Sequence, residues 1–328
     1  MKVVRFARGL PESACAGLIN ELKVLALLGE ERENCSPFVL QPFMVDGLWA
    51  WRSTRGNLHI VTDVCGGGSL TAYRFRLSYP SLVLVIAEIV LGLHWLHEHG
   101  IVHHDVKPGN VMVSASGHCV LGDFGGAQFL DHRGKLSRNS DSCMVMTTQF
   151  AAPEILVRLD DGQVKEYDEA VDYWSLGATI VSMVLEEDYL PGASEPAFME
   201  FRVDKIQTQL RRRNMPDDLE DLVMDLLRMD PARRCRYPAI MQQPIFYHTN
   251  WQDVENQAQA AIPALREIAA NAHGWEYPTP KIHKSNEATV DFLAALREQR
   301  LSLAVDDSYD VDRHNAKMAN CLSLGYPF

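Results

Sequence analysis

The chain has 328 residues, of which 47 % are hydrophobic and 23 % are charged, and its formal net charge is −12. This length is enough for two lobes or two domains, and the composition is ordinary for a globular protein. The acidic balance argues against a general nucleic-acid binder, because there is no basic excess to neutralise phosphates.

Cysteines and apolar runs bear on the cellular compartment. Seven cysteines are scattered along the chain without a C-x-x-C pair. This odd number favours a reduced, intracellular protein, cytoplasmic or nuclear, over a disulfide scaffold. The first ten residues carry charge without a following apolar stretch, so no secretory signal is expected. The apolar run 82–93 contains Glu88 and is too short to span a bilayer, so we expect a buried helix and no membrane span.

The first quarter of the chain favours strands beside one helix. Residues 2–5 are typical of a strand, and residues 13–28 place leucines at helical spacing. Strand-like runs follow at 38–45 and 58–64, with a linker between them. The glycines of "CGGGSL" (65–70) predict a hinge or turn that cannot continue a strand.

Helices dominate after this hinge. The apolar spacing predicts helices at about 81–99, 170–186, 201–213 and 217–228. In the tail, prolines interrupt the helical pattern, and Ser285 is placed to cap one further helix. We therefore expect an α+β fold in which a small strand-rich lobe joins a larger helical lobe.

Four motifs follow in order: "HHDVKPGN" (103–110), "GDFGGA" (122–127), "AAPE" (151–154) and "VDYWSLG" (171–177). Their order and separations resemble the eukaryotic protein kinase family over about residues 1–250. The resemblance implies a two-lobed fold, a protein substrate, and ATP and Mg²⁺ as cofactors. It divides the chain into a partial N-lobe (1–62), a hinge (63–68), a helical C-lobe (69–250) and a partly helical C-terminal tail (251–328).

The central motifs suit phosphoryl transfer, which depends on positioning and charge neutralisation. Asp105 is placed to orient the attacking hydroxyl and accept its proton, and Lys107 to touch the moving phosphoryl group. Asn110 and Asp123 supply the oxygen ligands that Mg²⁺ prefers. Gly125 lets the backbone turn beside the metal loop. Taken alone, such an aspartate is more often a turn or cap residue, but the joint occurrence reverses those odds.

Further residues are assigned to the nucleotide only by the resemblance: Lys2, Glu21, Thr62, Asp63, Cys65 and Met112. Lys2 would contact the α- and β-phosphates and pair with Glu21. A solvated terminal lysine is the alternative for Lys2. The backbone of Asp63 and Cys65 would hydrogen-bond the adenine, with Thr62 at the back of the pocket.

The resemblance also implies structural roles. Glu154 and Arg234 would form a buried ion pair, and removing one partner would leave a buried charge. Asp172 would brace the backbone of the catalytic loop.

Other structural positions lie around the catalytic loop. His103 and Phe124 resemble members of an apolar column that links the lobes. Thr147 resembles the hydroxyl that braces Asp105 and Lys107, and both Thr147 and Lys107 favour serine/threonine over tyrosine specificity.

The chain departs from the family pattern at the start. No glycine-rich strand-turn-strand is found ahead of Lys2, so we expect a truncated N-lobe sheet. The alternative to an active serine/threonine kinase is therefore a pseudokinase or scaffold with weak or no turnover. Gly109 stands where kinases of basic substrates often carry glutamate, so nothing supports arginine-directed substrate choice.

A further departure concerns activation. His104 replaces the arginine that many relatives carry before the aspartate, and Cys143 falls at the usual phosphorylated threonine. We hypothesise that activity does not require phosphorylation of this segment. Ser140 and Ser142 lie close enough to keep the opposite interpretation open.

A metalloenzyme is the third candidate, because five histidines crowd "HWLHEHGIVHH" (94–104). His94 and His97 have helical spacing, but Gly100 interrupts the helix and no third ligand has a convincing position. Surface or core histidines are favoured.

Overall fold

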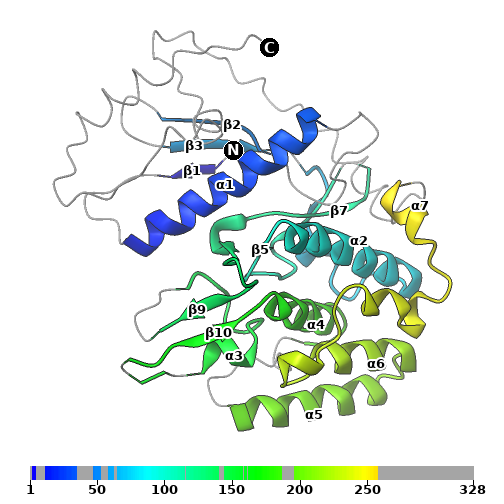
Figure 1. Ribbon diagram of the computed structural model, residues 1–328. Helices are drawn as coiled ribbons and strands as arrows, with labels where there is room; N and C mark the ends of the chain where they lie inside the picture. The colour runs from blue at the N-terminus through cyan, green and yellow to red at the C-terminus, as the bar shows by residue number, and fades with distance from the viewer. Residues whose placement is uncertain are drawn as a thin grey trace. The chain divides into compact units, whose positions relative to one another are not determined.

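The computed structural model describes residues 2–4, 12–34, 47–52, 58–62, 65–114, 116–139, 144–157, 159–160, 162–186 and 196–257. Their backbone contacts separate two compact units (Figure 1). The described residues up to Thr62 belong to the first unit, and those from Cys65 onward belong to the second. The first unit combines a three-stranded sheet with one long helix, and helices dominate the second unit, which confirms the predicted α+β class.

The first unit is an antiparallel sheet with one helix. The strands are β1 (Lys2–Val4), β2 (Gly47–Arg52) and β3 (Leu58–Thr62), in the order β1-β3-β2. Helix α1 (Glu12–Asn34) packs against β2 and buries Leu22, Val24 and Leu25. The predicted strand at the start and the predicted helix are confirmed, and the helix is longer than its apolar pattern.

Strand β2 corrects the predicted linker. It pairs with β3 through Trp49 opposite Val61 and Trp51 opposite His59. Aromatic residues favour strands, and this short run was overlooked because its period is not a strict alternation. The strand expected at 38–45 lies outside the described residues.

Helices form the body of the second unit, and they confirm the four predicted ones. Their bounds are α2 (Tyr79–Glu98), α3 (Pro153–Leu156), α4 (Ala170–Val184), α5 (Pro196–Arg212), α6 (Asp217–Leu226) and α7 (Trp251–Glu255). Helix α4 lies between α2 and α6 (Figure 1) and buries Tyr173 and Trp174. A Cβ at Gly177 would lie 2.9 Å from Cβ of Leu226, so glycine permits the close approach of α4 to α6.

Helix α2 is a core helix of the second unit. It confirms the predicted buried helix, but it extends beyond the apolar run 82–93, and among the described residues it is the one helix long and apolar enough to cross a membrane. However, 61 % of its apolar window is buried inside the protein, and a core helix passes the same test. Glu88 is buried within α2 and accepts hydrogen bonds from the His118 side chain and the Cys119 backbone, each at 2.7 Å.

Short strands complete the second unit. They are β4 (Gly68–Ser69), β6 (Val111–Val113) and β7 (Cys119–Leu121) in one sheet, β5 (Ile101–Val102) with β8 (Gln128–Phe129), and β9 (Leu136–Arg138) with β10 (Lys165–Tyr167).

The predicted turn is present at Gly66 and Gly67, and the short strand β4, which was not predicted, begins directly after it. Gly68 and Ser69 pair with β6, and the backbone N–H of Gly67 donates to the Val113 carbonyl. A Cβ at Gly67 would lie 2.6 Å from Cγ1 of Val113. The glycine therefore allows the chain to pair where a side chain would prevent it.

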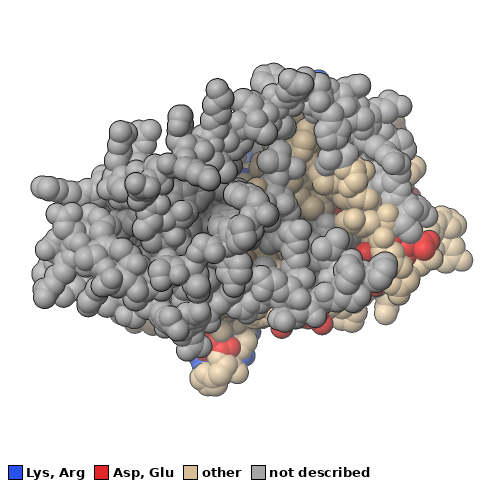
Figure 2. All heavy atoms as spheres, turned by 90° about the horizontal axis from the view of Figure 1, so that it is seen from above, with Lys and Arg blue, Asp and Glu red and all other residues tan. Residues whose placement is uncertain are grey.

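The structure describes no helix or strand beyond α7, and its surface charge follows the composition of the chain. Residues beyond Gln257, including the helix expected after Ser285, lie outside the described residues. On the face in Figure 2, more Asp and Glu than Lys and Arg atoms show on the described surface. This agrees with the net charge of −12.

Candidate active site

The loop 103–110 connects β5 to β6, and α4 holds its start. The carboxylate of Asp172, in the first turn of α4, accepts the backbone N–H groups of His103 and His104 at 2.8 and 2.9 Å. His97 of α2 lies 2.9 Å from the same carboxylate. Asp172 is fully buried, which raises its pKa, but the His97 hydrogen bond and the nearby histidines outweigh this, so the pKa is lowered overall.

Asp105 lies at the centre of a hydrogen-bond network. Its Oδ2 accepts from Lys107 Nζ at 2.7 Å and from Asn110 Nδ2 at 2.9 Å. Its Oδ1 accepts the backbone N–H of Thr147 at 2.8 Å. Lys107 Nζ also bonds the Thr147 hydroxyl at 2.5 Å. The structure therefore brings together four residues that the sequence analysis assigned to one site.

Asn110 and Asp123 are brought together through Gly122. The Gly122 N–H donates to the Asn110 carbonyl at 2.9 Å, and its carbonyl lies 3.2 Å from Nε2 of His103. The Asn110 Nδ2 group donates to both the carbonyl and the carboxylate of Asp105. These bonds orient the amide, and within the described part of the chain its Oδ1 has no partner.

This arrangement fits Mg²⁺. A side-chain amide oxygen and a nearby carboxylate are hard ligands, and Mg²⁺ takes few protein ligands because it keeps water and phosphate. Asn110 and Asp123 are therefore the residues that would hold it. Asp123 has φ 57°, a left-handed conformation that is strained outside glycine and is typical of functional sites.

The residues after Asp123 pack closely on the loop. The Phe124 ring is buried, with its centroid 5.5 Å from that of His103. Gly125 follows Phe124 in a 3₁₀ turn. A Cβ at Gly126 would lie 2.5 Å from the carbonyl oxygen of Val145. Gly126 was not recognised from the sequence, and it allows the segment before Thr147 to lie against the loop.

The residues predicted to bind the nucleotide are only partly described. Thr62 ends β3, Cys65 follows as a half-buried residue, and Met112 is half-buried in β6. Asp63 lies outside the described residues, as does the side chain of Lys2 in β1. Glu21 is buried in α1. The Lys2–Glu21 pair therefore stays a prediction.

Glu154 and Arg234 form the predicted ion pair. Arg234 Nη1 and Nη2 lie 2.6 and 3.0 Å from the two carboxylate oxygens of Glu154, and both side chains are buried. Arg234 also donates to the carbonyls of Ala170 and Arg228. These additional hydrogen bonds help to offset the cost of removing the two charges from water.

The histidines contact different partners. His94 stacks on Tyr237, and His104 Nε2 lies 3.1 Å from the Tyr167 hydroxyl. His97 bonds Asp172. Among the described residues no three His, Cys, Asp or Glu side chains form a group that could hold a metal ion. The roles of His97 and Tyr167 were missed, because each partner lies more than sixty residues away in the sequence.

Comparison with known proteins decides the family. A model of the protein kinase domain matches residues 33–246. The chain belongs to the protein kinase family. The loop 103–110, Asp123 and the Glu154–Arg234 pair all lie within the matched residues, whereas Lys2 and Glu21 precede them.

Two curated relatives are similar to this chain. They are the Citron rho-interacting kinase of Rattus norvegicus and that of Mus musculus, each 26 % identical over 249 residues. The alignment covers 72 % of this chain, and the chain spans 12 % of the length of these relatives. The proposed division into 1–62, 63–68, 69–250 and 251–328, and the expected absence of a glycine-rich loop, stay predictions.

Proposed function

We propose that the protein is a serine/threonine kinase that transfers the γ-phosphoryl group of Mg·ATP to a protein hydroxyl. The observation that carries this proposal is the network in which the carboxylate of Asp105 is held by Lys107, Asn110 and the Thr147 backbone. Phosphoryl transfer is the simplest explanation for this combination of residues in neighbouring loops. The combination consists of two aspartates, a lysine and an oriented side-chain amide.

The hydrogen bonds of Asp105 support a separate task for each of its carboxylate oxygens. Oδ2 accepts two hydrogen bonds, whereas Oδ1 accepts only the Thr147 N–H within the described residues. A carboxylate oxygen has about two acceptor sites. Oδ1 is therefore the atom that accepts the proton of the attacking hydroxyl, while Oδ2 keeps the carboxylate oriented.

Lys107 supplies positive charge where the phosphoryl group moves. In the transfer, a bond forms between the substrate oxygen and the γ-phosphorus, and the bond from that phosphorus to the bridging oxygen of ADP breaks. Lys107 Nζ, fixed between Asp105 and Thr147, offsets the charge on the moving group. Mg²⁺ held by Asn110 and Asp123 would neutralise charge on the phosphates.

The same contacts support a serine or threonine acceptor. Lys107 bonds the Thr147 hydroxyl, and together they border Asp105 on the side of the segment 144–150. A lysine two residues after the aspartate is the feature on which the serine/threonine assignment depends. Intracellular location, cytoplasmic or nuclear, remains a proposal that rests on the scattered cysteines.

Phosphorylation of a degenerate Ser/Thr peptide library with γ-labelled ATP tests the proposal. We expect transfer by the full chain and a loss of about a hundredfold or more in Asp105→Asn, because general-base catalysis contributes about 10²–10⁴-fold. Asp131→Asn is the matched control, since Asp131 is an exposed aspartate that bonds Arg133 and the loop after it. Absence of transfer by the full chain would instead favour the pseudokinase or scaffold.

A further inference from the structure

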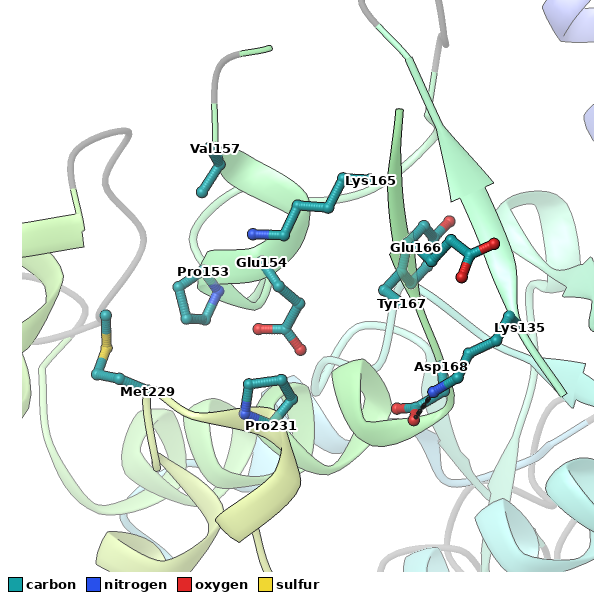
Figure 3. A pocket seen from close by; sticks show the side chains of 10 residues that line it. All are labelled: Lys135, Pro153, Glu154, Val157, Lys165, Glu166, Tyr167, Asp168, Met229 and Pro231. Atoms are coloured by element: carbon teal, nitrogen blue, oxygen red, sulfur yellow. Dashed lines mark hydrogen bonds and ion pairs between the residues drawn. The ribbon is translucent and has the colours of Figure 1, made fainter. Parts of the chain in front are cut away.

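A pocket of about 470 Å³ lies beside α3 and β10 in the second unit (Figure 3). Its apolar wall is made by Pro153, Val157, Met229 and Pro231. None of these residues takes part in the Asp105 network. The pocket is therefore a separate feature of the helical unit, with room for one or two side chains.

Charged side chains also line the pocket, and every carboxylate among them has a cationic partner. The pairs are Glu154 with Arg234, Glu166 with Arg133, and Asp168 with Lys135 and Arg236. The pocket therefore offers no unpaired negative charge from these residues.

One cation that lines the pocket, Lys165, and its cross-strand neighbour Arg138 lack such a partner among the described residues. Lys165 and Arg138 stand directly opposite one another where β10 pairs with β9. Arg138 Nη1 donates to the carbonyl of Val157 at 2.8 Å, and neither side chain has a carboxylate partner in the described residues. In Figure 3, the Lys165 side chain reaches across the pocket toward Pro153. Like charges directly opposite each other destabilise a strand pair.

This cross-strand pair is what points to a ligand. Two half-buried cations, one in the lining of an apolar pocket and one directly beside it, are best compensated by an external anion with an apolar group next to it. We propose that this pocket is a docking site for a protein partner whose peptide segment carries an Asp or Glu next to an aliphatic or aromatic residue. The carboxylate would pair with Lys165 and Arg138, and the apolar side chain would pack on Pro153 and Met229.

The position of the pocket in the chain suits a partner of a kinase. Its wall residue Pro153 follows the segment that contacts Asp105, and its wall residue Tyr167 bonds His104. Docking itself requires no phosphoryl transfer, so it can be measured on protein that is catalytically inactive.

The test is selection of a phage-displayed random heptapeptide library on the full chain, with counter-selection on Lys165→Ala. We expect enriched peptides to carry an Asp or Glu adjacent to an aliphatic or aromatic residue. Enrichment of peptides without an acidic residue, or no enrichment over the counter-selected protein, would overturn the proposal.

Fluorescence anisotropy of one enriched peptide then locates the site. We expect binding about tenfold weaker with Lys165→Ala and with Arg138→Ala, since each removes one charge-assisted contact. Lys165→Arg is expected to retain binding, and so is the control Arg212→Ala, an exposed cation on α5. A peptide that binds Lys165→Ala as tightly as the unchanged protein would contradict the assigned site. The melting temperature of each variant verifies that it is folded.

Discussion

The Nε2 atom of His104 lies 3.1 Å from the hydroxyl of Tyr167, and both side chains are buried. Burial lowers the pKa of His104. The imidazole next to Asp105 is therefore neutral near pH 7, and β10 fixes it through a hydrogen bond between uncharged groups. A neutral group at this position offers no charge to attract a phosphate.

The first prediction concerns activation. Because His104 is neutral and Cys143 stands where the resemblance expects a phosphorylated threonine, we expect phosphatase treatment to leave the activity unchanged. Peptide phosphorylation before and after treatment measures this. The double variant Ser140→Ala with Ser142→Ala should behave like the unchanged protein. Activity that disappears after phosphatase treatment and returns after rephosphorylation would refute the prediction.

The second prediction concerns pH. The unfolded chain protonates His104 near its ordinary pKa of about 6.5, whereas the folded chain does so only at lower pH. Below the ordinary value the unfolded state binds the additional proton, so this residue removes stability as the pH falls toward its lowered pKa.

The melting temperature at about pH 7.5 and about pH 5.5 gives the measurement. We expect a smaller decrease for His104→Asn than for the unchanged protein, since asparagine tolerates the left-handed φ of 65° found here. An equal or larger decrease in the variant would show that His104 does not contribute to the pH dependence.

The third prediction concerns the buried ion pair. Glu154→Ala leaves Arg234 buried without its charge partner, which is expected to cost about 3–5 kcal/mol of unfolding free energy. Urea unfolding measures this. Glu186→Ala removes an exposed partner of Arg213, and its cost is expected to be much smaller, because solvent screens an exposed pair. Similar costs for the two variants would contradict the importance assigned to burial.

The fourth prediction follows from the like charges of β9 and β10. Lys165→Glu places a carboxylate opposite Arg138, so we expect the unfolding free energy to rise by about 0.2–1 kcal/mol while peptide binding is lost. Thermal unfolding in low salt, where the effect is largest, measures the change. A decrease in the unfolding free energy would contradict the prediction, because it would show that Lys165 and Arg138 do not destabilise the strand pair.

Sequence analysis identified the parts of the site that lie close together along the chain. The spacing of Asp105, Lys107 and Asn110 was enough to predict that they lie together, because a single loop carries all three residues. Asp172 and the Glu154–Arg234 pair were assigned through the order of motifs, and the structure brings each to its expected partner.

Contacts that depend on packing between distant segments were not predictable in this way. Tyr167 reaches His104 only because β10 pairs with β9, and a strand of three residues leaves no periodicity. The glycine run predicts a turn, but it gives no sign of strand β4 directly after that turn, where Gly67 fits against Val113 and no side chain would. Tertiary packing decided both positions.

The thermal shift of the full chain with Mg·ATP tests the central assignment most directly, because it requires no knowledge of the protein substrate. A ligand that binds only the folded state stabilises it by about 2.7 kcal/mol at a concentration of 100 times Kd. We predict a magnesium-dependent rise in melting temperature that is lost in Asp123→Ala and kept in Asp131→Ala. No shift with Mg·ATP, or an equal shift in Asp123→Ala, would contradict the proposed nucleotide and metal site.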